Sequence, residues 1–471
     1  MIDLFYFGGY PVAVLGLGRS GLSAAKALVQ CGAEVSAWDD DPAKREAAAA
    51  AGIPIAELTA VDWRQMTTLV ISPGIPHDQP APHPVAALAR AGNCEIIGDI
   101  ELLARAQRDA GYIGITGTNG KSTTTSLIGH VLETAGRDVE VGGNLGIPVL
   151  ELAGLDSTGS YVLEMSSYQL EITFSITFDV AVLLNISPDH LERHGGFEGY
   201  VKAKREIFRR QTKPRTAVIG TDDETCRAIF EELRQADEQN VIPISGNTAV
   251  AGGVFQQNGI LIDDLEGQAA PVLSLADVPS LPGIHNAQNA AAAYAVCKTM
   301  GVQPPVIAAC ISSFPGLSHR QEVIAVVDGI VYINDSKATN AEAAKRALAC
   351  YGRIYWIAGG RAKDGGLDGV EPLLSRVAKA FLIGEAEGAF ADQLDGKVAL
   401  SRCGDLASAL EEARAAAMND AEADRVVLLS PAAASFDQFS DFEARGEAFR
   451  ALVEALPGRH EDLGPGGRVL Q

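Results

Sequence analysis

Residues 112–123, YIGITGTNGKST, decide the fold of the central part of this chain. The apolar run that ends at Thr116 predicts a buried β-strand, and Lys121 to Ala135 predicts a helix that Gly136 ends. A glycine-rich turn between a strand and a helix lets backbone N–H groups face an anion, and the helix N-terminus adds positive potential. The segment therefore predicts a phosphate-binding loop in an α/β domain.

The side chains at the start of this helix fit the same function. Lys121 can reach the terminal phosphates of a nucleotide, and the hydroxyl of Ser122 or Thr123 can bind Mg²⁺. The spacing is a G-x-x-G-K-S variant, because Ile115 stands where the longer and commoner motif has its first glycine. The alternative is a glycine-rich turn with an exposed lysine. The flanking strand and helix favour phosphate binding.

The rest of the chain repeats short apolar runs and longer amphipathic ones, which is the pattern of parallel sheets covered by helices. The predicted strands outside the central region are Pro11–Leu15, Ala33–Trp38, Leu69–Ile71, Val331–Asn334, Arg353–Ala358, Ala380–Ile383 and Arg425–Ser430. Asn258-Gly259 inside VFQQNGILI predicts a β-hairpin, so the central region also contains antiparallel strands.

A length of 471 residues predicts about three domains of roughly 150 residues each. We expect an α/β protein with a Rossmann-like N-terminal domain (1–109), a central P-loop ATPase domain with a mixed sheet (110–316) and a C-terminal Rossmann-like domain (317–471). The tail from about residue 458 lacks an apolar period and is expected to be disordered.

Composition limits the functions to consider. The formal net charge of −22 argues against nucleic-acid binding, which needs clustered Lys and Arg, but local amides and a lysine can still hold a small anion. The seven cysteines form no C-x-x-C pair and indicate reduced thiols rather than disulfides or a zinc site. With no signal-peptide pattern and no apolar run of membrane-spanning length, the chain is expected to be cytoplasmic, without membrane insertion.

A second glycine-rich stretch, GLGRSG at 16–21, also lies between a predicted strand and helix, and Asp39 follows the next strand. Glycines at this position admit a pyrophosphate, and the acidic residue can accept ribose hydroxyls. This pattern fits NAD, but it fits a UDP-sugar equally well.

Candidate metal ligands follow two predicted central strands. Glu164 ends one strand, and Asn185, Asp189 and His190 come just after the next. A carboxylate and an imidazole at neighbouring strand ends can share a metal ion beside the phosphate loop, although each alone is more often a structural residue. The basic run at 202–210 has the composition of a solvated helix face, and nothing in the residues themselves singles out Lys204.

Taken together, the motifs GTNGKST, LEMSSYQLE, LNISPDHLERHG, PGIHNAQNA, GLSHRQE and INDSKATN resemble those of the Mur ligase family, in the same order and over nearly the whole chain. GLGRSG, SPGIP, VGGNLGIP and SPAAASFDQFSDFEARG are most similar to the family member that adds D-glutamate. The D-N-P-R signature of the diaminopimelate-adding member is absent from the sequence.

The resemblance implies a function and substrates. We expect an ATP-dependent ligase of peptidoglycan precursor synthesis that joins D-glutamate to UDP-N-acetylmuramoyl-L-alanine through an acyl phosphate, releasing ADP and phosphate. ATP and Mg²⁺ are the implied cofactors, and we expect a monomer.

The resemblance also assigns roles to residues. The implied catalytic residues are Lys121, His190, Lys204 and Lys337. The implied ATP contacts are Gly117, Thr118, Asn119, Gly120, Lys121, Ser122, Thr123, Asn286, Asn289, Arg320 and Asp335. The implied metal ligands are Ser122, Glu164, His190 and Lys204, the last as a carbamylated lysine. The implied UDP-substrate contacts are Gly18, Ser20, Asp39, Ser72, Gly74, Asn144 and His190, and the implied D-glutamate contacts are Thr339, Lys363, Ser435 and Phe442.

Three alternatives stay open from the residues. GLGRSG alone fits an NAD-dependent oxidoreductase, but that function leaves the phosphate loop unexplained. A non-catalytic nucleotide-binding module is the second alternative, and the presence of Lys121, Glu164, His190 and Lys337 argues against it. The third keeps the ligase class and changes the amino acid that is added.

Overall fold

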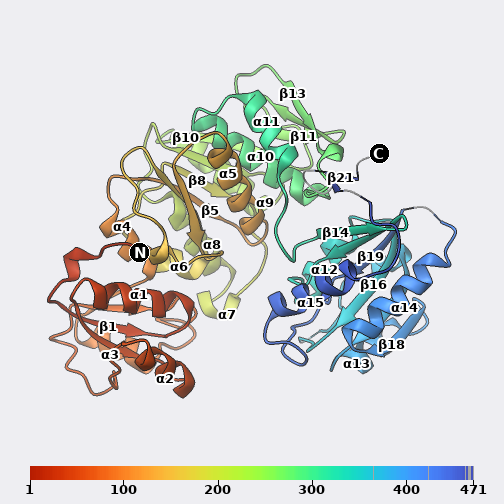
Figure 1. Ribbon diagram of the computed structural model, residues 1–471. Helices are drawn as coiled ribbons and strands as arrows, with labels where there is room; N and C mark the ends of the chain where they lie inside the picture. The colour runs from red at the N-terminus through yellow and green to blue at the C-terminus, as the bar shows by residue number, and fades with distance from the viewer. Residues whose placement is uncertain (364, 423, 462, 465–467, 470–471) are drawn as a thin grey trace. The chain divides into compact units, whose positions relative to one another are not determined.

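The computed structural model describes residues 1–363, 365–422, 424–461, 463–464 and 468–469. The described residues form three large sheets in chain order, coloured red, orange to green, and teal to blue in Figure 1. The chain divides into two compact units. The first comprises Met1–Leu273 and Ala287–Cys310, and the second comprises Ser274–Asn286 and Ile311–Gln471. The expected three α/β sheets are confirmed, and the domain boundaries at 109 and 316 stay predictions.

The N-terminal sheet has four parallel strands in the order β2-β1-β3-β4. Its strands are β1 (Pro11–Leu15), β2 (Glu34–Trp38), β3 (Thr68–Ile71) and β4 (Glu95–Ile97), and its helices are α1 (Arg19–Gln30), α2 (Pro42–Ala50), α3 (Pro84–Ala91) and α4 (Asp99–Ala106). Alternate β1 side chains point to opposite faces, as strand geometry requires. Val12 and Val14 pack in the core that contains α1 and α4, and Ala13 and Leu15 pack in the core that contains α3.

The middle sheet has nine strands in the order β13-β12-β11-β10-β9-β8-β5-β7-β6. The strands are β5 (Gly111–Thr116), β6 (Val139–Gly143), β7 (Ser160–Glu164), β8 (Val180–Leu183), β9 (Thr216–Gly220), β10 (Asn240–Ser245), β11 (Val254–Gln257), β12 (Ile260–Asp263) and β13 (Ala270–Ser274). The helices are α5 (Lys121–Thr134), α6 (Ser167–Glu171), α7 (Leu191–His194), α8 (Phe197–Arg205), α9 (Glu224–Ala236), α10 (Ile284–Thr299) and α11 (Pro304–Ser313).

Strands β5 to β10 of this sheet are parallel to their neighbours, whereas β11 and β12 form the expected antiparallel hairpin. Asn258 and Gly259 both have positive φ, of 53° and 79°, as a two-residue hairpin turn requires. One core cluster includes apolar side chains of both the N-terminal and the middle sheet, for example Val12 and Val14 of β1 and Tyr161 and Leu163 of β7. This shared core explains why the first two sheets form one compact unit.

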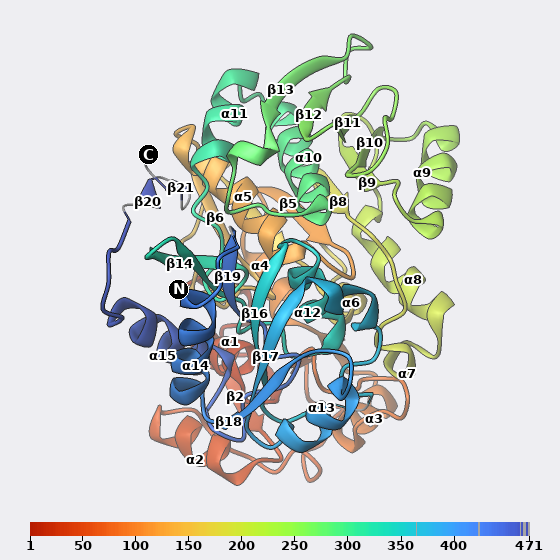
Figure 2. The ribbon, with the colours of Figure 1, turned by 90° about the vertical axis from the view of Figure 1, so that its right-hand side faces the viewer.

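The C-terminal sheet has the order β14-β15-β19-β16-β17-β18, with β14 antiparallel to β15 and the other pairs parallel (Figure 2). Its strands are β14 (Glu322–Val327), β15 (Ile330–Asn334), β16 (Arg353–Gly359), β17 (Val377–Ile383), β18 (Leu400–Gly404) and β19 (Arg425–Leu429), and its helices are α12 (Ala341–Leu348), α13 (Glu387–Leu394), α14 (Leu406–Met418) and α15 (Phe442–Glu454).

Helices cover both faces of the C-terminal sheet. Ile354 and Trp356 of β16 pack in a core with α12 and α13, while Tyr355 and Ile357 of the same strand pack in a second core with α14 and α15. A strand buried on both faces gives a continuous apolar run in sequence. That run is why the sequence predicts this strand well.

The first residues of the tail that begins near residue 458 bond to β14, and the disorder expected for this tail stays a prediction. Asp328 N donates to Arg459 O (3.0 Å), and Glu461 N donates to Val326 O (2.9 Å), so residues 459–461 lie along β14. The short strands β20 (Leu463–Gly464) and β21 (Arg468–Val469) pair with each other. The rest of the predicted disordered tail lies outside the described residues.

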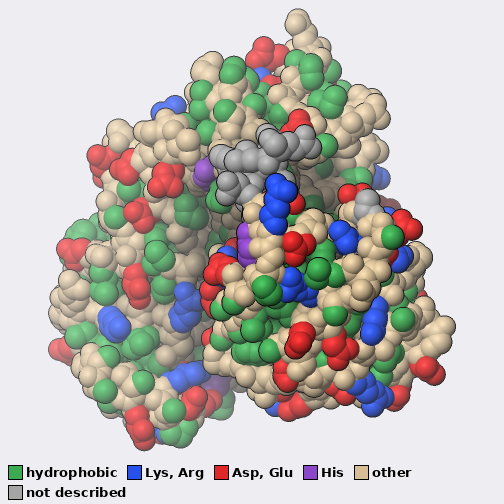
Figure 3. Space-filling view, turned by 45° about the vertical axis from the view of Figure 1, so that its right-hand side comes forward, with side chains coloured by type: hydrophobic (Ala, Val, Ile, Leu, Met, Phe, Trp, Pro, Cys, Tyr) green, Lys and Arg blue, Asp and Glu red, His purple; other side chains and the backbone are tan. Residues whose placement is uncertain are grey.

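Two general features of the described residues bear on the environment of the protein. No described helix combines the length and the hydropathy that a membrane span would need. On the face drawn in Figure 3, Asp and Glu side chains are interspersed with Lys and Arg, as is usual for a solvent-exposed surface.

Candidate active site

The glycine-rich loop lies where the sequence predicts it, between β5 and α5. Asn185, which follows β8, holds the loop in shape. Its backbone carbonyl accepts a hydrogen bond from Thr118 N (2.8 Å), and its side chain exchanges hydrogen bonds with the backbone of Asn119 (2.9 and 3.2 Å). Gly120 has a φ of 83°, and a Cβ there would lie 2.3 Å from Asn289 Oδ1. A loop fixed in this way presents a preformed anion site at the N-terminus of α5.

Lys121 folds back over the loop. Its Nζ donates to the carbonyls of Gly117 (2.9 Å) and Thr118 (3.0 Å). Ser122 and Thr123, the two hydroxyl residues that follow, are buried at the start of α5. The lysine is therefore held close to the position in which it would meet a bound phosphate.

Glu164 ends β7, on the other side of β5 from β8. Asn144 Nδ2 donates to Glu164 Oε1 (2.7 Å), whereas the buried Oε2 makes no hydrogen bond with any described residue. A buried carboxylate oxygen without a donor is costly unless a cation or another donor reaches it. The chemistry of Glu164 thus fits a ligand to a hard cation such as Mg²⁺.

His190 lies in the left-handed region, with φ 51° and ψ 32°, immediately before α7. Burial lowers the pKa of His190, the nearby positive charges of Lys121 and Lys204 lower it further, and Asp189 opposes them. A neutral imidazole has a lone pair for a metal ion. The segment that leads to His190 lies against the phosphate loop, because Ser187 N donates to Thr118 Oγ1 (3.0 Å).

Lys204 corrects one interpretation of the sequence, that the basic run is a solvated helix face. Lys202 is exposed, but Lys204 has only 1% of its surface exposed. Its Nζ donates to Gly117 O (2.8 Å) and lies 4.6 Å from the centre of the Tyr200 ring. Burial, and then the charge of Lys121, lowers the pKa of Lys204 well below its ordinary value. The spacing of apolar residues along α8 could have indicated that Lys204 is buried, because the buried Tyr200 and Ala203 lie on the same inner face of the helix.

The predicted metal ligands are one carboxylate, one imidazole, one hydroxyl and one lysine. Within the described ranges there is no group of three or more His, Cys, Asp or Glu side chains that could hold a metal ion. The predicted set provides two such side chains, of which only Glu164 is anionic, so a second anionic ligand would have to come from a modified Lys204 or from a bound phosphate.

Most of the residues that are predicted to contact the UDP-substrate lie at or near the second glycine-rich loop. Asp39 is buried after β2, and its two oxygens accept hydrogen bonds from Leu17 N (2.7 Å) and Asp41 N (2.9 Å). Ser72 Oγ donates to Gly16 O (3.1 Å). A Cβ on Gly21 would lie 1.8 Å from Gly16 O, so only glycine permits this approach of α1 to β1. Asp39 therefore shapes the loop, and its contact with the UDP-substrate stays a prediction.

The other predicted contacts of this group lie close by. Gly18 precedes α1 in an extended conformation, and a Cβ on Gly74 would meet nothing within 4 Å, so the surface beside each is open. Ser20 is near Asp99, whose pKa burial raises to about 6. Asn144 instead lies against Glu164, but Arg19 Nη2 donates to Gly146 O (2.5 Å) and so connects the two loops.

In the second unit, Asp335, Lys337 and Thr339 follow the carboxyl end of β15, Lys363 follows β16 and Ser435 follows β19, whereas Asn286 lies on α10 and Arg320 precedes β14. Burial raises the pKa of Asp335 to about 7, while its oxygens accept from Ser430 Oγ (2.8 Å) and Gln321 N (3.2 Å), and the charge of Arg320 opposes the shift. Lys337 Nζ lies 4.3 Å from the centre of the Phe442 ring.

The other predicted members of this unit differ in burial. Asn286 is buried, and its Nδ2 donates to Pro282 O (2.7 Å). Ser435 is buried after β19, Thr339 follows β15, and Lys363 is exposed in the loop after β16. Asn286, Arg320 and Asp335 therefore belong to the second unit, whereas Asn289 and the phosphate loop belong to the first.

Comparison with known proteins supports the resemblance to the Mur ligases. A family model described as "Mur ligase middle domain" matches residues 115–297, and one described as "Mur ligase, glutamate ligase domain" matches residues 319–433. UDP-N-acetylmuramoylalanine–D-glutamate ligases of Rhodospirillum rubrum and Phenylobacterium zucineum are each 50% identical to this chain. The first alignment covers 99% of both chains, and the second covers 98% of this chain and 100% of the relative.

The chain belongs to the Mur ligase family. Solved structures agree on the fold. The UDP-N-acetylmuramate-alanine ligase MurC of Thermotoga maritima has a TM-score of 0.58 at 17% identity, covering 94% of this chain and 99% of its own. The MurF ligase of Thermotoga maritima in complex with ADP has a TM-score of 0.55 at 17% identity, covering 96% and 97%.

Sequence reasoning missed two buried arginines of this Mur ligase. Arg445 on α15 is 1% exposed and donates to Ser336 Oγ, Ser336 O and Ala433 O (2.9, 2.9 and 3.1 Å). It thus joins the ends of β15 and β19. The only signal was an arginine among small residues in FEARG, at helical spacing from Phe442 and Phe449.

The second is Arg193 on α7, three residues after His190. Its guanidinium donates to Ile75 O and Gln79 O, each at 3.4 Å, and lies 5.1 Å from the centre of the Tyr168 ring. Arg193 therefore connects the segment that carries His190 to the loop that carries Ser72 and Gly74.

Proposed function

We propose that this Mur ligase uses ATP to join D-glutamate to the L-alanine carboxylate of UDP-N-acetylmuramoyl-L-alanine, in the synthesis of peptidoglycan precursors. Full-length 50% identity to ligases named for this reaction carries the proposal. The preformed phosphate loop with Lys121 supports the use of ATP.

The reaction proceeds in two chemical steps. An oxygen of the L-alanine carboxylate attacks the γ-phosphorus of ATP, which forms an acyl phosphate and releases ADP. The amino group of D-glutamate then attacks the acyl carbon, loses a proton, and expels inorganic phosphate as the amide forms. Phosphoryl transfer depends mainly on position and on neutralising charge.

The residues of the first unit neutralise and position the phosphates. The Lys121 ammonium exchanges its two carbonyl partners for phosphate oxygens, and the loop N–H groups and the start of α5 contribute further positive potential. Mg²⁺, when bound, withdraws charge from the phosphate oxygens. Ser122, the free oxygen of Glu164 and neutral His190 are the residues that would hold it.

Lys204 supports the same site as a carbamate. Burial lowers the pKa of Lys204, so this amine loses its proton more readily than an exposed lysine does. The unprotonated amine can attack CO₂ with loss of one further proton, which leaves a carboxylate on the side chain. That conversion places a negative charge next to Lys121 and provides an anionic ligand in addition to Glu164.

The second unit provides the D-glutamate site. Lys337, together with Thr339, Ser435, Phe442 and Lys363, surrounds the amino acid and the reacting carboxylate in this proposal. The buried Arg445 orients the loops that carry them. The free thiols of all seven cysteines fit a reducing cytoplasm, where we place a monomeric enzyme.

The test measures inorganic phosphate release with ATP, Mg²⁺ and UDP-N-acetylmuramoyl-L-alanine, comparing D-glutamate with L-glutamate, L-alanine, glycine and diaminopimelate. We expect release that depends on D-glutamate. Release with another amino acid would move the assignment within the family. Absence of release with every amino acid would refute the proposal.

A further inference from the structure

A polar cavity outside the candidate active site lies in the first unit, at the edge of the middle sheet where its parallel strands begin. Its volume is about 680 Å³. Its lining includes Gly111 and Tyr112 at the start of β5, Asp179 just before β8 and Arg215 just before β9. The phosphate loop follows the other end of β5, six residues and therefore roughly 20 Å away. This cavity is separate from the candidate active site.

The lining has a positive charge that is unusual in an acidic protein. The fourteen lining residues include four arginines and two aspartates, an excess of two positive charges in a chain of net charge −22. They are Arg105, Arg108, Arg210, Arg215, Asp109 and Asp179. Since like charges repel, gathering arginines from separate segments in one cavity favours an anionic ligand.

The four arginines are not equivalent. Arg105 is already neutralised by Glu95 and Glu101, at 2.7 and 2.8 Å. Arg108 uses its Nε for a backbone carbonyl (3.1 Å), and Arg210 uses one Nη for two carbonyls of the 174–176 segment (2.5 and 3.1 Å). The other guanidinium N–H groups of Arg108 and Arg210 have no hydrogen-bond acceptor among the described residues.

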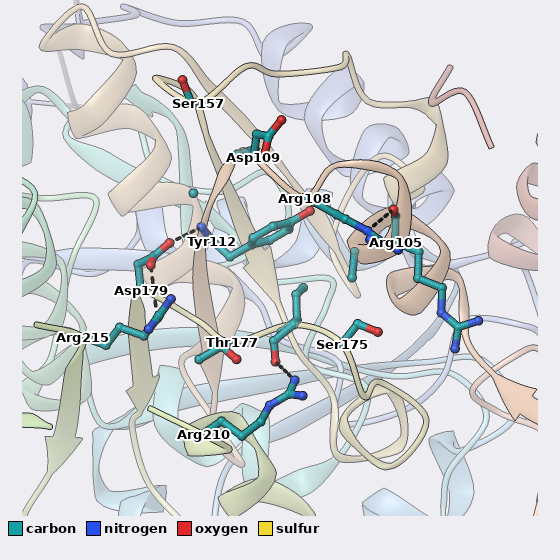
Figure 4. Close-up of a pocket in the computed structure, with 14 residues that line it drawn as sticks. Arg105, Arg108, Asp109, Tyr112, Ser157, Ser175, Thr177, Asp179, Arg210 and Arg215 are labelled. Carbon is teal, nitrogen blue, oxygen red and sulfur yellow. Dashed lines mark hydrogen bonds and ion pairs between the residues drawn. The ribbon is translucent and has the colours of Figure 1, made fainter. Parts of the chain in front are cut away.

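Arg215 is incompletely satisfied as well. Its buried Nε lies 3.4 Å from Asp179 Oδ1, an ion-pair distance, but it makes no hydrogen bond with the described residues. Asp179 meanwhile accepts from Tyr112 N (3.0 Å). Figure 4 shows Asp179 between Arg215 and Tyr112 at one side of the pocket, with Thr177, Ser175 and Arg210 below it.

We propose that this cavity binds a phosphate ester or diphosphate, held by Arg108, Arg210 and Arg215. Guanidinium groups pair with phosphate oxygens through two parallel hydrogen bonds, and Ser157, Ser175 and Thr177 add hydroxyl donors. The volume lies within the range of small-molecule sites and exceeds what free phosphate fills, so the ligand carries an organic or second phosphoryl group.

The position of the cavity indicates what binding does. Arg108 lies between α4 and β5, in the segment that joins the N-terminal sheet to the middle sheet, whereas Arg210 and Arg215 both lie in the segment that leads into β9. A ligand that contacts all three links this connecting segment to the middle sheet. Binding therefore stabilises the connection between the two sheets of the first unit.

Isothermal titration of the full chain with pyrophosphate, and separately with inorganic phosphate, tests the proposal. Pyrophosphate also fits the phosphate loop, so the experiment compares the R108Q/R215Q variant with the K121M variant. R64Q is the matched control, because Arg64 is a single arginine paired with Asp62, 82% exposed and away from the cavity.

We expect a cavity site for pyrophosphate in the wild type and in R64Q, in addition to binding at the glycine-rich loops 16–21 and 117–123. K121M keeps the cavity site, and R108Q/R215Q loses it, with binding weaker by about tenfold or more because two charge-assisted contacts are removed. Single R108Q, which changes an exposed side chain, weakens the site severalfold and covers the case in which the double variant does not fold. Pyrophosphate should bind more tightly than inorganic phosphate.

Hydrogen exchange locates the site independently of affinity. In K121M, pyrophosphate should slow amide exchange in residues 108–112 and 210–216. Binding that is unchanged in R108Q/R215Q, or that disappears entirely in K121M, would overturn the proposal. The ligase activity of R108Q, measured without added pyrophosphate, should equal that of the wild type.

Discussion

Replacing Gly120 with alanine should damage the phosphate loop through one identifiable contact. Gly120 has a φ of 83°, and its new Cβ would lie 2.3 Å from Asn289 Oδ1. Asn289 is itself held by Thr124, whose Oγ1 donates to the same oxygen (3.2 Å). The substitution thus acts on the backbone of the loop and on the side chain behind it.

The two effects can be estimated separately. A non-glycine residue in the left-handed region costs about 1–2 kcal/mol. Forcing the Asn289 side chain aside adds about 1–3 kcal/mol, the usual range for overpacking a buried site. Gly120→Ala should therefore destabilise the loop and the start of α5 by roughly 2–5 kcal/mol in total.

A double-mutant cycle with Asn289→Ala separates the contributions. Asn289→Ala alone should cost about 1 kcal/mol through the lost hydrogen bond. In that background the new Cβ of Gly120→Ala no longer meets Asn289 and still lies 3.2 Å from Leu184 Cδ1, so the substitution should cost mainly the backbone penalty, about 1–2 kcal/mol. The interaction free energy between the two sites is then about 1–3 kcal/mol.

Amide hydrogen exchange in α5 is the appropriate assay, since it reports local opening free energies in a protein of more than one compact unit. Gly136→Ala is a matched control for the left-handed penalty, because Gly136 has a φ of 76° and a Cβ there meets nothing within 4 Å. If Gly120→Ala costs the same with and without the Asn289 side chain, to within about 0.5 kcal/mol, the contact does not act as described.

Three further results follow from the structure. Glu164→Gln should reduce kcat by about a hundredfold or more, because the unpaired oxygen of Glu164 loses its charge. Phosphate release across a range of Mg²⁺ concentrations measures the effect. The control variant Glu133→Gln, at an exposed position of α5, should leave kcat unchanged. Asp335→Asn should gain thermal stability relative to the wild type between pH 5 and pH 8. Burial raises the pKa of Asp335 to about 7, so the stability that its protonated form contributes is complete below pH 4 and is lost as the pH rises through 7. The asparagine variant stays neutral and does not lose this stability. A stability difference between variant and wild type that does not change with pH would contradict this. Arg445→Met should destabilise the second unit by about 3 kcal/mol or more, because it leaves several buried oxygens without a donor; thermal unfolding beside exposed Arg402→Met measures it, and equal melting temperatures for the two variants would refute the role.

The fold followed from the sequence where a strand is buried on both faces. Strand β1 has the predicted ends, and β16 extends one residue beyond its predicted end, because continuous apolar runs bounded by polar or glycine residues have few other interpretations. The division into units did not follow. The segment Ser274–Asn286 belongs to the second unit, although the residues before and after it, including the start of α11, belong to the first. Only contacts between segments that are distant in the sequence reveal such a grouping.

The site followed as far as strand ends determine it. Glu164, Asn185 and His190 come after parallel strands, so they had to lie along the edge that carries the phosphate loop. Lys204 and Arg445 lie on helices, and composition treats a helix lysine or arginine as solvated. Their burial depends on which face of α8 or α15 packs inward, which the apolar spacing indicates only once the neighbouring sheet is known.

The contacts of Lys121 have a consequence for selectivity. Because its Nζ already donates to two carbonyls of its own loop, an incoming molecule competes with partners that are in place. An uncharged ligand offers oxygens no better than these carbonyls and gains little by displacing them. A phosphate offers a full negative charge, and the exchange is favourable. The loop therefore selects against neutral compounds of similar shape and releases Lys121 only to an anion.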